Sequence, residues 1–122
     1  MKKLNNKKGF TLAELLIVVA IIAVLVAISI PIFSAQLEKA GEATDAANLR
    51  SKYAEMMANA LTGDATASDT ETVTQKQTVA GWTAEPDWPE NMTVSAPKAS
   101  GSWTLSFTTD SNGLIDGIEA TN

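Results

Sequence analysis

The chain divides by hydropathy into a long apolar stretch near its start and a mixed remainder. Leu15–Ile28 is unbroken apolar sequence, and with Ser29 and Pro31 tolerated the run extends to Phe33. A helix over 10–33 would be about 36 Å long, enough to cross a hydrocarbon core of roughly 30 Å. A buried helix of a globular domain is the alternative, but no other segment is apolar enough to enclose it. We therefore expect residues 10–33 to span a membrane, in contact with lipid.

The region that follows, 34–61, keeps the spacing of an amphipathic helix. Gly41 weakens its middle and permits a bend, and Gly63 stands where a C-terminal cap is expected. One long helix is therefore predicted, with its second half packed on a small domain. The apolar stripe comprises Phe33, Leu37, Ala40, Thr44, Ala47, Tyr53, Met56 or Met57, and Ala60, whereas the charged residues Glu38, Lys39, Glu42, Asp45, Arg50, Lys52 and Glu55 lie mostly elsewhere.

The remaining residues, 62–122, predict a small globular head with an antiparallel β-sheet. The clearest strand is Ser102–Thr108, in which apolar and polar residues alternate strictly. The sequence DSNG then supplies turn chemistry, and Leu114–Ala120 returns as the partner strand, with Gly117 marking a bulge. The chain is therefore expected to be α+β, with a long helix packed on this sheet.

Three weaker segments complete the predicted head. Thr72–Val79 and Met92–Ser95 are expected to form short strands. Gly81–Asn91, with the sequence GWTAEPDWPEN, predicts an irregular surface loop because it holds two prolines. Trp82 and Trp88 in this loop either cover the edge of the small core or face a ligand.

Composition excludes several classes of function. The formal net charge is −5, and the chain contains neither Cys nor His. These absences remove disulfides, Cys/His zinc sites, thiol nucleophiles and the usual general base. An acidic body argues against nucleic-acid binding, which needs clustered Lys and Arg. We expect no enzymatic activity and no cofactor.

Basic residues cluster ahead of the apolar run. Lys2, Lys3, Lys7 and Lys8 precede Gly9, and every acidic residue follows it. This asymmetry predicts a cytoplasmic N-terminus and an exported remainder. Ordinary secretory signals have a shorter apolar region followed by a cleavage site. Here the obvious junction, Gly9-Phe10, comes before the run, so the helix would survive processing.

The stretch KKGFTLAELLIVVAIIAVLVAISIPIF closely resembles the N-terminal signature of type IV pilins and of the related pseudopilins of type II secretion and competence systems. The matching positions are Gly9, Phe10, Thr11, Leu12, Glu14 (fifth after the junction) and Pro31. The C-terminal half carries no comparable signature. The resemblance implies a pilin-like fold and a leader peptide, residues 1–9, which a prepilin peptidase removes after Gly9. It also implies N-methylation of the new Phe10 amine.

The same resemblance implies partners and a location. The subunit would leave the cytoplasmic membrane and join a homo-oligomeric helical filament, driven by an assembly ATPase and a platform protein. That filament would be an extracellular pilus or would span the envelope. Some related pseudopilins bind calcium near the C-terminus, which makes Asp110, Asn112 and Asp116 a weak calcium candidate. Their spacing does not complete an EF-hand loop, and a plain hairpin turn is the simpler interpretation.

Glu14 is a charge in an apolar helix and needs a compensating group. Cleavage would create a positive amine at Phe10, one helical turn away, and Glu14 of one subunit would meet the Phe10 amine of a neighbour. An unpaired partner costs several kcal/mol in a low dielectric, so the pair would enforce register. Pairing within one subunit and simple snorkelling to the interface are the alternatives.

Pro31 lacks an amide proton and obstructs the preceding turn. A kink or local melting is therefore expected over 27–31, unless Pro31 simply marks the membrane exit.

The leading function is that of a structural filament subunit, a type IV pilin or, nearly equally, a pseudopilin. Adhesion, motility, DNA uptake and secretion are all compatible with it. A single-pass anchored binding module that uses the Trp-containing loop is a further alternative, and it predicts no cleavage at Gly9 and tolerance of Glu14→Leu.

Overall fold

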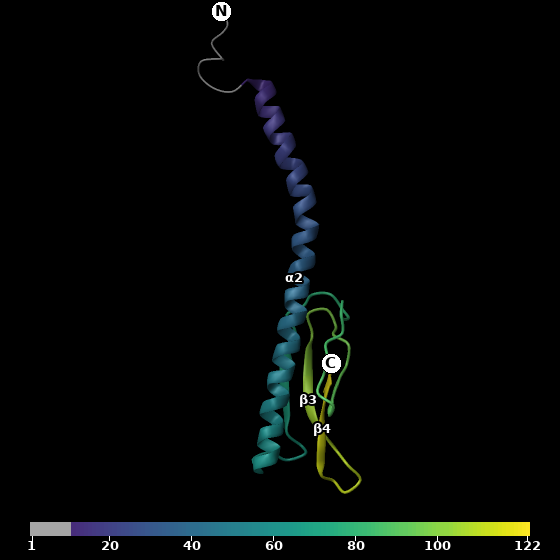
Figure 1. The fold of residues 1–122 in the computed structure, drawn as a ribbon. Coiled ribbons are helices and arrows are strands. Elements are labelled where there is room, and N and C mark those ends of the chain that lie inside the picture. The colour runs from purple at the N-terminus through teal and green to yellow at the C-terminus, as the bar shows by residue number, and fades with distance from the viewer. Residues whose placement is uncertain (1–10) are drawn as a thin grey trace, which may run out of the picture. The chain divides into compact units, whose positions relative to one another are not determined.

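The structure, a computed structural model, describes residues 11–122. One helix, α2 (Leu12–Thr62), precedes four strands (Figure 1). The strands are β1 (Thr70–Thr74), β2 (Met92–Val94), β3 (Ser102–Thr109) and β4 (Ile115–Thr121). The chain forms two compact units, one ending at Gln36 and the other comprising Leu37–Asn122. The predicted α+β class is confirmed, and one helix contributes residues to both units.

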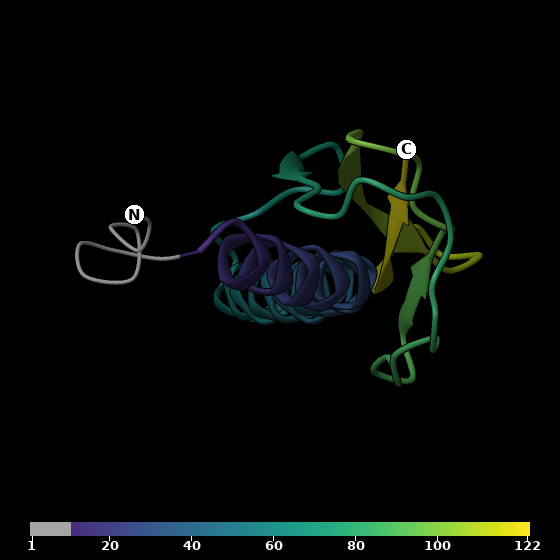
Figure 2. The same ribbon diagram turned by 90° about the horizontal axis from the view of Figure 1, so that it is seen from above.

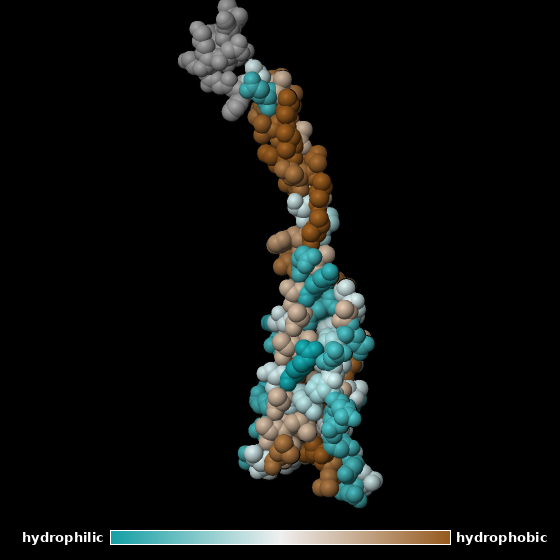
Figure 3. Space-filling model, in the orientation of Figure 1, coloured by the Kyte–Doolittle hydropathy of each residue, from teal (hydrophilic) through white to brown (hydrophobic). Residues whose placement is uncertain are grey.

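The first unit consists, among the described residues, of the apolar part of α2. This helix is long and apolar enough to cross a membrane, and nothing in the structure buries its most apolar stretch. Its large side chains from Leu12 to Phe33 are all about half exposed or more, and they form the brown band in Figure 3. A continuous apolar surface of this kind needs lipid or other helices around it.

Pro31 lies inside α2, and the helix continues through it without a break. The local melting expected over 27–31 is therefore wrong for this structure. Proline removes the one hydrogen bond that its own amide would donate, while the turns on both sides keep theirs. A kink at Pro31 stays a prediction.

The second unit contains a four-stranded sheet in the order β1-β3-β4-β2. β3 pairs antiparallel with both β1 and β4, as the alternating pattern and the DSNG turn predict. β2 instead runs parallel to β4, so the sheet is mixed rather than wholly antiparallel. The cause is the long connection 75–91, which returns the chain to the end of the sheet where β1 begins. β2 therefore runs in the same direction as β1 and β4.

The core of this unit lies between the sheet and the second half of α2. Trp103, Leu105 and Phe107 point inward from β3, as predicted, and their polar neighbours point outward. Leu49 and Met56 meet them from the helix. Viewed from above, the strands lie to one side of the second half of α2 (Figure 2). Burial of these side chains supplies the main stabilisation, at about 1.5–3 kcal/mol for each.

Two turns match their sequence signals. Gly63 has a positive φ of 82° and ends α2 with two bonds, Gly63 N–H to Ala60 O and Asp64 N–H to Asn59 O. This pair of bonds is the Schellman arrangement, so the predicted cap is confirmed. In the β3–β4 hairpin the register shifts where Thr108 faces Gly117 and Thr109 faces Ile115, which places a bulge beside Gly117.

Candidate functional site

The first described turn of α2 is capped by Thr11. Its hydroxyl oxygen accepts the N–H of Glu14 at 3.2 Å, and its carbonyl accepts the N–H of Leu15 at 3.1 Å. A threonine with a glutamate three residues later forms the sequence of a capping box. This hydrogen bond satisfies the Glu14 amide, which has no partner within the helix and could not be solvated by lipid. The sequence carried this signal, although the role of Thr11 was not inferred from it.

Glu14 is exposed on this first turn. A carboxylate at the third helical position lies in the positive field of the helix N-terminus, which favours it there. Among residues 11–122 its carboxylate forms no hydrogen bond or ion pair. Gly9 and Phe10 lie outside the described residues. Cleavage after Gly9, methylation of Phe10 and the Phe10–Glu14 pair therefore stay predictions.

A second constellation lies in the head. Three carboxylates of α2, those of Glu38, Glu42 and Asp45, accept hydrogen bonds from the loop that follows β1. We call these three residues the carboxylate clasp. Their spacing of four and three residues places them on one face of the helix. Further along α2 the same face continues as Leu49 and Met56 in the apolar core.

Asp45 is the most buried member of the clasp, with none of its surface exposed. One oxygen accepts the N–H of Lys76 at 2.6 Å, and the other accepts that of Gln77 at 3.1 Å. A buried carboxylate is costly without partners, and here each oxygen has an amide donor. The Gln77 side chain continues the network by donating to the carbonyls of Val79 and Gly81.

Glu38 and Glu42 hold the rest of the loop. The Glu38 carboxylate accepts the N–H groups of Thr78 and Val79, each at 2.9 Å, and also the Thr78 hydroxyl. Glu42 accepts the N–H and the hydroxyl of Thr83. The Val79 amide is the main cause that lowers the pKa of Glu38 below its ordinary value. The two donors of Thr78 add to this effect, and desolvation opposes it.

The clasp corrects two predictions. The sequence pattern placed Glu38, Glu42 and Asp45 mostly off the packed face of the helix, and instead Glu42 and Asp45 are buried. Four residues of 34–61 assigned to the packed stripe are instead exposed: Leu37, Ala40, Thr44 and Ala47. The prediction was wrong because an acidic side chain is expected to face solvent unless its hydrogen-bond donors are known. Here the donors are backbone amides, which every residue except proline has, so the sequence does not identify them.

The clasp also explains why β1 ends early. Thr72–Val79 was predicted to be a strand, but β1 is Thr70–Thr74. Beyond it the amides of residues 76–79 bond to the clasp instead of to β3. Gly41 lets this loop approach, because a Cβ there would lie 3.2 Å from Gln77 Cα. The structure thus gives Gly41 a role in loop packing.

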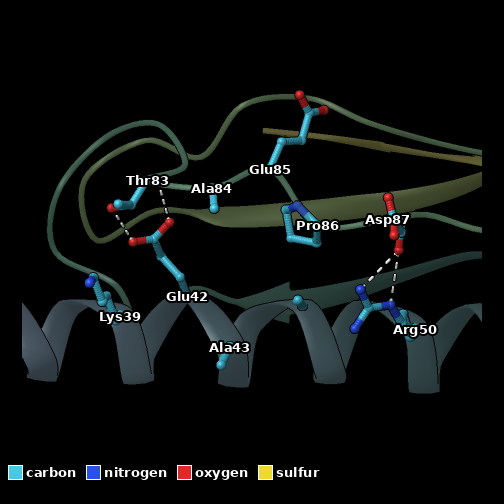
Figure 4. Close-up of a pocket in the computed structure, with 10 residues that line it drawn as sticks. Lys39, Glu42, Ala43, Arg50, Thr83, Ala84, Glu85, Pro86 and Asp87 are labelled. Atoms are coloured by element: carbon cyan, nitrogen blue, oxygen red, sulfur yellow. Dashed lines mark hydrogen bonds between the residues drawn. The ribbon is translucent and has the colours of Figure 1, made fainter.

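An open groove of about 650 Å³ runs between α2 and residues 83–87 (Figure 4). Two of the polar side chains that line it, Arg50 and Glu42, bond to the loop. The Arg50 guanidinium donates twice to the Asp87 carbonyl and lies over the Trp88 ring, 5.4 Å from its centroid. Glu42 reaches across the groove to Thr83. The groove therefore secures the loop against the helix, and none of these contacts points to a ligand.

The tryptophans of this loop cover the core. Trp82 stacks on Trp103 with ring centroids 5.8 Å apart, and Trp88 lies 5.7 Å from Trp82 at a steep angle. Both loop tryptophans are half-buried and pack against the core cluster. The core-covering interpretation is confirmed.

The weak calcium candidates lie in and beside the β3–β4 hairpin. One carboxylate oxygen of Asp110 accepts the N–H groups of Asn112 and Leu114, and Asp116 accepts the Thr108 hydroxyl. These bonds, with the positive φ of Gly113, give the plain hairpin turn. Within residues 11–122 no group of three or more acidic side chains is placed to hold a metal ion.

The comparisons bear on the N-terminus. Residues 4–30 match the family model of the prokaryotic N-terminal methylation motif. The resemblance seen in the sequence is thus confirmed over this stretch, which carries the type IV pilin and pseudopilin signature. No curated protein and no solved structure matches the chain.

Proposed function

We propose that this chain is a non-enzymatic structural subunit of a type IV pilus filament. In this proposal a prepilin peptidase cleaves after Gly9, Phe10 is methylated, and the mature subunits pack by their N-terminal helices. The observation that carries it is the methylation motif over residues 4–30, joined to an apolar helix left uncovered in the isolated chain.

The physical argument concerns the two states of the apolar helix. In lipid its apolar surface is satisfied, but Glu14 remains an expensive charge. In a bundle of parallel helices the apolar surface is also covered, and Glu14 would meet the Phe10 amine of a neighbour. The ion pair between Glu14 and the Phe10 amine therefore favours the helix bundle over residence in lipid. This ion pair cannot form before the leader peptide is removed, because the Phe10 amine does not yet exist. The cap at Thr11 supports this arrangement, because it fixes the helix start next to the junction.

Pseudopilins of secretion and competence systems share this N-terminus, and their filaments are the alternative. An anchored binding module is less well supported, because the tryptophans that would serve it are packed on the core. Assembly would need a platform protein and an ATPase in either filament system.

Mass spectrometry of the N-terminus in material sheared from the cell surface tests the proposal. We expect a mature chain that begins with methylated Phe10. Sheared fibres whose subunits begin at Met1 would contradict it. A processed and methylated chain that stays with the envelope, with no fibres in the sheared fraction, would favour the pseudopilin alternative.

A further inference from the structure

The end of the second unit at which α2 stops has an exposed apolar surface. Leu61 and Leu114 are 84% and 65% exposed, and they border a groove of about 470 Å³. The groove is formed by the helix end, the loop after it and the β3–β4 turn. Its lining comprises Met57, Ala60, Leu61, Ala67, Gly113, Leu114 and Ile115. We call this surface the Leu61 end.

The rim of the Leu61 end is acidic. Asp64 follows the helix cap, Asp69 lies in the next loop, and Asp110 begins the hairpin turn. No Lys or Arg occurs in residues 53–75 or 99–122, which include the residues of this end. The carbonyl end of α2 adds partial negative charge at the same place. Two such ends brought together would repel each other.

The opposite end of the same unit has a different surface. Val79 and Leu37 are 59% and 58% exposed, and Lys39 is exposed beside them. Lys39 forms no ion pair in residues 37–122. Glu38 also lies at this end and keeps its negative charge, because the amides of Thr78 and Val79 that bind its carboxylate are neutral donors. We call this surface the Val79 end.

We propose that the Leu61 end of one copy receives the Val79 end of a second copy, with Val79 and Leu37 against the apolar groove and Lys39 against its acidic rim. This inference rests on the proposed filament function and names the contact between heads. Two observations favour this occupant: the rim lacks bases while Lys39 has no ion partner in residues 37–122, and Val79 and Leu37 supply exposed apolar side chains for the groove. Because the two surfaces lie at opposite ends of one unit, the contact is heterologous, and in the proposed filament it repeats from one copy to the next.

The contact fixes a distance along the filament. Leu37 and Leu61 are 24 helical positions apart, which corresponds to about 36 Å along the axis of α2. Copies in contact are therefore displaced by roughly that length along the direction of their heads. A helical reconstruction of the fibres would measure this displacement directly.

Cysteine pairs give the main test, because the chain contains no Cys. Fibres of Val79→Cys/Leu61→Cys, treated with mild oxidant or a short thiol cross-linker, should give a ladder of covalent multimers. The matched control is Thr104→Cys/Leu61→Cys, because Thr104 is exposed in the middle of β3, away from both ends. The control should give no ladder.

The other outcomes overturn the inference in distinguishable ways. Fibres with methylated Phe10 but no Val79–Leu61 ladder would reject this contact and leave the filament function intact. A strong dimer band from Leu61→Cys alone would show that like ends meet. A wild-type chain that is never processed would reject the filament function and the contact with it.

A charge exchange tests the electrostatic part. Lys39→Glu or Asp64→Lys alone should lower the fibre yield roughly tenfold, because each places like charges together. The double variant Lys39→Glu/Asp64→Lys should restore most of the yield. Circular dichroism of each variant in detergent checks that the head still folds, and failure of the double variant to recover would reject the proposed ion contact.

Discussion

The buried carboxylate of Asp45 accepts the amide N–H of Gln77 at 3.1 Å, although the two residues lie 32 positions apart in the chain. Asp45 is fully buried and Gln77 nearly so. The same carboxylate accepts the N–H of Lys76. One acidic side chain on the helix thus takes the place of a neighbouring strand for a segment that has left the sheet.

Replacement of Asp45 by Ala should destabilise the head strongly. It leaves two amides without their acceptor, at a cost of about 3 kcal/mol in the free energy of unfolding. Urea unfolding of the full chain in detergent, followed by tryptophan fluorescence, measures the change. The control is Asp69→Ala, which removes an exposed acceptor of the Thr66 N–H and should cost under about 1 kcal/mol. Equal effects of the two variants would contradict the role assigned to Asp45.

Acid should weaken the hold of Glu38 on the loop. Its pKa is lowered in the folded chain from 4.5, chiefly by the Val79 amide. Its contribution to stability is therefore complete above the unfolded pKa and is lost as the pH falls through the lowered folded pKa. We expect Glu38→Gln to lose less stability than the wild type when the pH drops below 4.5. The measurement is the urea midpoint as a function of pH.

The matched control for that experiment is Glu85→Gln, since Glu85 is an exposed carboxylate of the same region that accepts no hydrogen bond in residues 11–122. The pH dependence of Glu38→Gln is compared with that of this variant and with that of the wild type. If the three curves coincide, the amide bonds do not favour the charged form of Glu38.

Gly117→Ala should destabilise the sheet. A Cβ at this position would collide with the carbonyl oxygen of Asn91, which accepts the N–H of Ile118 at 2.9 Å, and would lie 3.0 Å from the Thr108 hydroxyl. Backbone must then move, at about 1–3 kcal/mol. Gly101→Ala is the control, because its Cβ would meet nothing closer than 3.5 Å, and thermal unfolding of both variants gives the comparison. A larger loss at Gly101 would refute the argument.

Glu14→Ala should separate membrane insertion from assembly. The variant removes the only charge in the apolar part of the helix, so insertion should be unchanged or improved. Fibres should be absent or thinned, because the registering pair is lost. Fractionation of membranes and electron microscopy of sheared material measure the two properties. Glu55→Ala on the exposed face of α2 is the control, and normal fibres from Glu14→Ala would rule out the pair.

Local patterns predicted the elements whose partners are close in sequence. The alternation of Trp103, Leu105 and Phe107 predicted the inner face of β3, and the following turn predicted its pairing with β4. Gly63 predicted the helix cap, and the bonds to Ala60 and Asn59 confirm it. In each case the residues that determine the structure lie within a few positions of one another.

Contacts across the chain were not predictable in the same way. The parallel pairing of β2 depends on the path of residues 75–91. No short sequence pattern predicts the path of such a long loop. The carboxylate clasp depends on amide donors about 31 to 41 positions away, and every residue except proline offers the same donor. The helix cap at Thr11 differs from these contacts because it is local. Thr11 and Glu14 are three positions apart, so this cap could have been predicted from the sequence, although it was not.

The chemistry of the clasp has an evolutionary consequence. The groups that hold Lys76 and Val79 in place are their main-chain amides, whereas their side chains point to solvent. Substitution at either position, proline excepted, leaves these bonds available. The exposed side chains of this loop can therefore change while the hydrogen bonds that hold it to the helix remain. A lineage of such subunits can vary this part of the surface of the head at little cost in folding stability.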